Sequence, residues 1–205
     1  MFLRERPQAI LPKIPLPKDQ VLRLEITIEE IMPPIYRKID IPNTYTFYQL
    51  HHVIQLAYEW TNSHMFEFMN GTETIGDEEA KIDAKKLTLK ERFYEPKQKM
   101  LYVYDFGDNW EHKIKVEKMF DADPKKRYPA CVSGRRAGPP EDVGGVGGYE
   151  HFLEAIEDDE HPEHEAYLEW LGDYFDSESF SRKEVNALLR DYADGKLNPD
   201  QWWEE

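Results

Sequence analysis

Three residues that could do chemistry stand close together in the middle of the chain: Asp105, Asp108 and His112. Two carboxylates and a histidine can hold a metal ion, and a bound metal can activate water for hydrolysis. A simpler interpretation exists for each of them. An Asp beside Gly107 often caps its own backbone in a tight turn, and a core histidine can be satisfied by one hydrogen bond. We favour a core role for His112 and keep a metal-dependent hydrolase as an alternative.

A predicted β-hairpin positions these residues. Its turn lies at residues 107–109, where Gly, Asp and Asn tolerate the positive φ angles of a short connection. In the second strand His112 alternates with charged residues, so it is expected on the same face as Trp110 and Ile114. We expect the two strands at residues 100–106 and 110–118.

Other possible metal ligands are scattered along the chain: His64, Cys131, His161 and His164. Their spacing matches no standard zinc motif, so we predict no metal site and no cofactor. Pro162 explains the His-rich segment as the start of a helix. Cys131 is expected to be a small buried residue, because no neighbouring feature would lower the pKa of its thiol.

The segment at 128–145 is predicted to be a rigid loop ending in a helix. Backbone amides of the glycines at 144–148 could cradle an anion at that helix start. The segment lacks the Lys-Ser or Lys-Thr pair of a P-loop, and Glu141 and Asp142 would repel phosphate. We therefore interpret the glycines as a close-packed turn.

Composition indicates a globular protein with an acidic surface. The 205 residues are 40% hydrophobic and 33% charged, with a net charge of -15. Such a surface repels phosphate backbones, so nucleic acid is not an expected partner. The basic residues between Lys125 and Arg136 leave one alternative open, a nucleic-acid-associated accessory protein.

The number of cysteines and the hydropathy of the chain indicate the cellular compartment in which the protein is expected. Cys131 is the one cysteine, which suits a reducing compartment, and we expect a cytoplasmic protein. No stretch approaches the roughly 18 apolar residues of a membrane span, so no membrane partner is expected. Residues 1–18 are predicted to form a Pro-rich N-terminal extension, followed by a single domain at 19–205.

The order of predicted elements favours the α+β class. Strict alternation predicts a strand from Leu22 to Ile28, and further strands are expected at 35–41 and 64–68. Thr46 can cap a helix reaching about Trp60. A polar excursion is expected at residues 70–86, and one helical turn at 88–93. Helices are expected at 149–156, at 163–171, and between a capping box at 181–184 and Gly195.

We therefore predict a largely antiparallel sheet with a helix packed on one face and a helical C-terminal third. The chain also resembles the plasmid pRiA4b ORF-3-like family, whose members are also labelled as passenger proteins of mobile elements. The matching segments run in order along the chain: 21–28, 33–37, 57–60, 63–68, 104–112, 128–131, 138–145, 161–165 and 170–171. The resemblance implies the fold of that family and no established activity.

Relatives commonly carry cysteines where this chain has Gly138 and Val143, and often one at Ser63. A cysteine-rich zinc site, if relatives have one, is lost here.

The resulting hypothesis is a non-catalytic binding or interaction module. Its partner would be an unidentified protein or a small polar ligand. Trp110 and Tyr104 would supply apolar contact, while Asp105, Asp108 and Arg135 would orient the ligand. The predicted concave surface consists of Tyr104, Asp105, Asp108, Trp110, His112 and Arg135.

Overall fold

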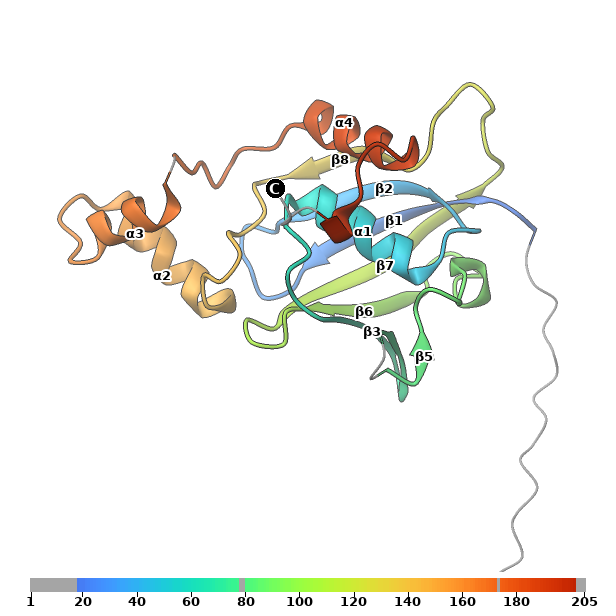
Figure 1. Ribbon diagram of the computed structural model, residues 1–205, viewed down its shortest axis with the longest axis horizontal. Helices are drawn as coiled ribbons and strands as arrows, with labels where there is room; N and C mark the ends of the chain where they lie inside the picture. Colours follow the sequence, from blue (N-terminus) through green and yellow to red (C-terminus); the bar gives the residue numbers. More distant parts are fainter. Residues whose placement is uncertain (1–17, 78–79, 173, 202–205) are drawn as a thin grey trace, which may run out of the picture.

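The computed structural model describes residues 18–77, 80–172 and 174–201, and these form an eight-stranded sheet with helices (Figure 1). The strand order is β5-β4-β3-β6-β7-β1-β2-β8. Neighbouring strands are antiparallel except β4 and β5, which are parallel. The strands are β1 Val21–Ile28, β2 Tyr36–Pro42, β3 Phe66–Asn70, β4 Glu73–Gly76, β5 Ile82–Asp83, β6 Lys99–Tyr104, β7 Trp110–Phe120 and β8 Ala130–Arg135.

The α-helices are α1 Phe47–Tyr58, α2 Gly145–Glu157, α3 His164–Leu171 and α4 Arg182–Ala193, and the short 3₁₀ helices are η1 Leu89–Glu91 and η2 Pro199–Gln201. Figure 1 shows α1 lying across one face of the sheet and α4 beside β8. The helices α2 and α3 extend to one side of the sheet. The predicted α+β class and the largely antiparallel sheet are confirmed. The predicted extension at 1–18 lies outside the described residues except for Lys18.

Alternation in β1 determines which side chains reach the core. Leu22 and Leu24 are fully buried, whereas Arg23 between them points to the opposite face. The predicted helix after Thr46 is α1. The Thr46 hydroxyl accepts a hydrogen bond from the backbone N–H of Gln49, and the Gln49 side chain accepts one from the Thr46 N–H. This helix ends at Glu59, which has a left-handed φ of 64°.

Three segments differ from the sequence prediction. The polar excursion at 70–86 contains the short strands β4 and β5, and the predicted rigid loop from 128 contains the edge strand β8. Strand β8 includes Ser133 and Gly134 and shows no clean alternation, so its strand conformation depends on pairing with β2. The helix expected from 149 begins at Gly145, because the glycines form its first turn.

Candidate functional site

The β6–β7 hairpin forms as predicted, and its turn is held by Asp105. This residue has a φ of 56°, and its side chain accepts a 2.9 Å hydrogen bond from the Gly107 backbone N–H. Its own N–H donates to the Met65 carbonyl at 2.9 Å. Asp105 therefore caps its own turn, as the simpler interpretation of the sequence expected.

Asp108 holds the glycine-rich turn in place. Its carboxylate accepts a 3.0 Å hydrogen bond from the Gly144 backbone N–H. Gly145 has a φ of 68°, and a Cβ there would lie 2.3 Å from the Asp108 carbonyl oxygen. Only glycine permits this close approach, so the close packing expected of these glycines is confirmed, although residues 145–148 form the first turn of α2 and not a separate turn.

Trp110 and His112 lie in the core, so they cannot contribute to a concave binding surface. Both are 0% exposed. They share one face with Ile114, as predicted, but this is the face that packs against α1 and the residues following it. The His112 Nδ1 N–H donates to the Trp110 carbonyl at 2.9 Å, and burial lowers the pKa of His112 to about 4. The structure therefore contains a neutral core histidine with one side-chain hydrogen bond, and its buried Nε2 has no partner among the described residues.

The proposed metal ligands Asp105, Asp108 and His112 do not come together. The structure places Asp105 in a different cluster, where its carboxylate lies 3.6 Å from His64 Nε2. The Asp142 carboxylate lies 3.2 Å from the same nitrogen. Asp108 binds a backbone amide and His112 is buried, because successive turns and strands direct these side chains to different places. The hydrolase built on that trio therefore has no geometric support.

Tyr104 is the predicted site residue that connects to a surface pocket. Its hydroxyl donates to the Glu141 carboxylate and accepts a 3.1 Å hydrogen bond from the Ser63 backbone N–H. The backbone N–H of Thr61 donates to the same carboxylate at 2.8 Å. The Tyr104 ring stacks on Trp60, with centroids 5.0 Å apart. Glu141 thus joins the end of β6 to the chain that follows α1.

A pocket of about 510 Å³ opens next to this junction. Four segments far apart in the sequence form it: β2, the end of α1, the loop after β8, and the stretch from the end of α3 to the start of α4. Its lining contains aromatic rings and prolines, namely Tyr58, Trp60, Pro139, Pro140, Tyr174, Phe175 and Phe180. It also contains four carboxylates: Glu59, Glu141, Asp176 and Glu184. The pocket therefore offers apolar contact around whatever polar groups line it.

Arg37 is the cation that lines this pocket, and it is 2% exposed. Its guanidinium lies between two rings, 4.8 Å from the Tyr58 centroid and 4.5 Å from the Phe180 centroid. Burial lowers the pKa of this guanidinium from its usual value, but arginine stays protonated in proteins. A buried positive charge is therefore present in the pocket wall.

The hydrogen bonds of Arg37 leave one guanidinium nitrogen, Nη2, without a protein partner among the described residues. Nε donates to the Ala57 carbonyl at 2.7 Å, one of the carbonyls left free at the end of α1. Nη1 donates to the carbonyls of Tyr36 and Arg135 at 2.9 and 3.0 Å. Within the described residues, Nη2 donates to no protein group and no carboxylate pairs with the guanidinium.

Sequence reasoning missed Arg37 although a signal was present. It shares a strand face with Ile39 and Ile41, and a lone cation on an apolar strand face is unusual. Arg135, which was predicted, contributes its backbone carbonyl to Arg37. Its own side chain is 53% exposed at the sheet edge, with the Glu178 carboxylate 4.0 Å away.

Comparison with known proteins agrees with this architecture. Residues 20–184 match the model of the family described as plasmid pRiA4b ORF-3-like protein. An uncharacterised protein, y4hQ of Sinorhizobium fredii (strain NBRC 101917 / NGR234), is 38% identical over 180 residues, covering 84% of this chain and 92% of its own. The crystal structure of MM3350 from Methanosarcina mazei Go1, a protein of unknown function, superposes with a TM-score of 0.75 at 41% identity. It covers 82% of this chain and 98% of its own.

Fold and sequence together define an α+β protein of a family without a known activity. This chain belongs to the plasmid pRiA4b ORF-3-like family. Among the described residues, every helix is too short or too polar to span a bilayer.

Proposed function

We propose that this protein is a non-catalytic binding module and that its ligand carries a carboxylate or similar planar anion beside an apolar, aromatic portion. The observation that carries the proposal is the buried Arg37 guanidinium, which lacks a carboxylate partner among the described residues and lines an aromatic pocket. A planar anion matches the fork geometry of arginine, and it would neutralise a charge held in a poorly hydrated place. Tyr58, Trp60 and Phe180 would contact the apolar portion.

The location of this pocket modifies the binding surface expected from the sequence. Tyr104 supports the pocket through Glu141, and Arg135 supports it through a backbone carbonyl. Asp105 and Asp108 shape the neighbouring hairpin and glycine turn. These four residues act as scaffold in the proposal, and Arg37 contacts the ligand.

The test uses a matched pair of small probes, phenylacetate and its neutral analogue phenylacetamide, in thermal-shift and calorimetric titrations. Phenylacetate is expected to raise the melting temperature of the wild-type protein and phenylacetamide is not, because only the carboxylate can pair with Arg37. The variant Arg37→Lys keeps the charge but loses the fork, so it should bind phenylacetate at least about tenfold more weakly.

The control variant is Arg135→Gln, which removes a neighbouring exposed cation. Its affinity for phenylacetate should stay within about twofold of wild type, since an exposed charge contributes little. Equal binding of the two probes, or a larger loss in Arg135→Gln than in Arg37→Lys, would overturn the assignment of Arg37 as the anion-contacting residue.

A further inference from the structure

A second cleft, of about 810 Å³, lies on the other side of the segment that contains Phe180 and Ser181. It is formed by β1, β2, the start of β8 and the chain before it, and α4 with the residues just before it. Six of its lining residues are basic, and they come from three separate segments: Arg23, Lys126, Arg127, Arg182, Lys183 and Arg190. Asp40 is the acidic residue among the described lining residues. This concentration contrasts with the net charge of -15 of the whole chain.

Ion pairs account for only part of this charge. Arg23 makes a bidentate pair with Asp40, with both N–O distances at 2.7 Å. Arg127 pairs with Asp194 outside the cleft at 3.0 Å.

The other four basic residues form no ion pair within the described part of the chain: Lys126, Arg182, Lys183 and Arg190.

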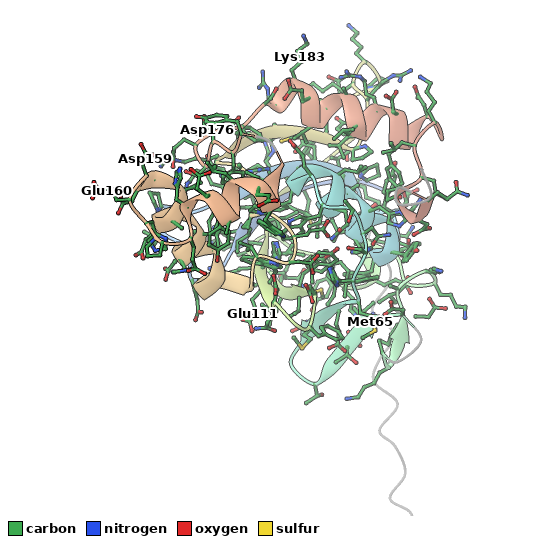
Figure 2. All side chains as sticks on the ribbon, turned by 60° about the vertical axis from the view of Figure 1, so that its left-hand side comes forward. Met65, Glu111, Asp159, Glu160, Asp176 and Lys183 are labelled. Atoms are coloured by element: carbon green, nitrogen blue, oxygen red, sulfur yellow. The ribbon has the colours of Figure 1, made fainter. Side chains whose placement is uncertain are left out.

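Two of these cations lie at the N-terminus of α4. Arg182 and Lys183 are the first residues of α4, where the positive end of the helix already disfavours cations. Figure 2 shows Lys183 extending outward from this end of the helix. Departures from such a local rule occur preferentially at functional sites. A bound anion would relieve the mutual repulsion of these charges and interact with the helix end at once.

We propose that this cleft binds a compact polyanion carrying two or more phosphate groups. Arginine forks and lysine ammonium groups are the usual phosphate partners, and several phosphates are needed to engage cations on both walls of the cleft. A compact ligand fits better than an extended nucleic acid, because a long strand leaving the cleft would cross the surface of a chain whose net charge is -15. The site is separate from the Arg37 pocket, so either proposal can fail without the other.

The experiment is a calorimetric titration with sodium tripolyphosphate at about 50 mM salt, repeated at higher salt. The cleft variant is the triple substitution Lys126→Gln, Lys183→Gln and Arg190→Gln. The control is Lys86→Gln, Lys97→Gln and Lys99→Gln, which removes the same charge from exposed lysines outside the cleft. All six side chains are exposed, so both variants should fold, which circular dichroism verifies.

Tripolyphosphate is expected to bind the wild-type protein and the control within about twofold of each other. The cleft variant should lose at least about tenfold in affinity and show a shallower salt dependence. An equal loss of affinity for tripolyphosphate in both triple variants would show that the anion is attracted by the overall charge of the protein and not by the cleft, and would overturn the proposal. Absence of binding at about 50 mM salt would do the same. Tighter binding of a single-stranded oligonucleotide than of tripolyphosphate would replace the compact ligand with a nucleic acid.

Discussion

The hydroxyl of Tyr104 donates a hydrogen bond to the carboxylate of Glu141, which ties the end of β6 to the proline-rich loop of the Arg37 pocket. The two residues are far apart in sequence, and each belongs to one of the two motifs that stand out in the chain. The contact links the two motifs, since the motif that contains Tyr104 supports the pocket wall formed by the motif that contains Glu141.

Replacing Glu141 with Gln should therefore destabilise the protein. Tyr104 and Thr61 both donate to this carboxylate, and an amide has a single acceptor oxygen and would set its NH₂ against one of these donors. We expect the free energy of unfolding in urea to fall by about 1–3 kcal/mol. Glu111→Gln is the control, because Glu111 is exposed on β7 (Figure 2) and its substitution should change stability by less than about 0.5 kcal/mol. Equal effects would contradict the role of Glu141.

Gly134→Ala should weaken ligand binding at the Arg37 pocket. A Cβ at this position would lie 2.5 Å from the Phe180 ring and 3.0 Å from Arg37 Cδ, so the ring must move away from the guanidinium. We expect weaker binding of phenylacetate in calorimetry. The matched control is Gly147→Ala in α2, where an added Cβ meets nothing within 4 Å. Unchanged affinity in Gly134→Ala would separate Phe180 from the ligand site.

Stability should decrease on acidification through the titration of buried histidines. Burial lowers the pKa of His112 to about 4 and that of His51 to about 3 in the folded state. The unfolded chain binds protons near pH 6.5, so it takes up more protons than the folded chain between that pH and the lowered pKa. The stability is fully present above about pH 6.5 and is lost as pH falls toward 4, by about 3 kcal/mol for His112.

His112→Asn tests this, because asparagine can keep a donor toward the Trp110 carbonyl without titrating. Urea unfolding measured from about pH 7 down to about pH 4.5 should show a weaker pH dependence for this variant than for wild type. Trp110→Phe is the control. It disturbs the same core without removing a titratable group, so it should lower stability and keep the wild-type pH dependence. A steep dependence in His112→Asn would contradict the assignment.

Cys131 should be unreactive in the folded protein. Its side chain is 3% exposed, and burial raises the pKa of the thiol to about 11. The thiolate is the reactive form, so modification by a thiol-specific disulfide reagent at neutral pH should proceed only after unfolding. The comparison is the reaction rate in buffer and in urea, followed by absorbance. Rapid labelling of the folded protein would show that the thiol is accessible.

Alternation and turn chemistry in the sequence were sufficient to predict β1, α1 and the β6–β7 hairpin. In each case the apolar period and the bounding residues, such as Thr46 and Asp105, act locally. The strand β8 escaped prediction because Ser133 and Gly134 carry no strand signal and are held by β2. Local patterns therefore predict the elements that would be favoured alone, but not an edge strand defined by its partner.

The functional surfaces were the harder part. Strand parity correctly placed His112 and Trp110 on one face, but parity alone does not state which face is covered by a helix. Arg37 can be recognised as part of a pocket only from the tertiary structure, which places the Phe180 ring, from the segment before α4, against its guanidinium.

The sequence by itself determined the family, the α+β class and the hairpin, because these depend on residue order and local backbone preference. Only the tertiary structure decided where charge is concentrated. Lys126 and Arg190 face the same cleft although they are distant in the chain, and Arg37 is enclosed by rings from two other segments. The physical reason is that an electrostatic site depends on distance through space and on burial, and both are set by packing between elements.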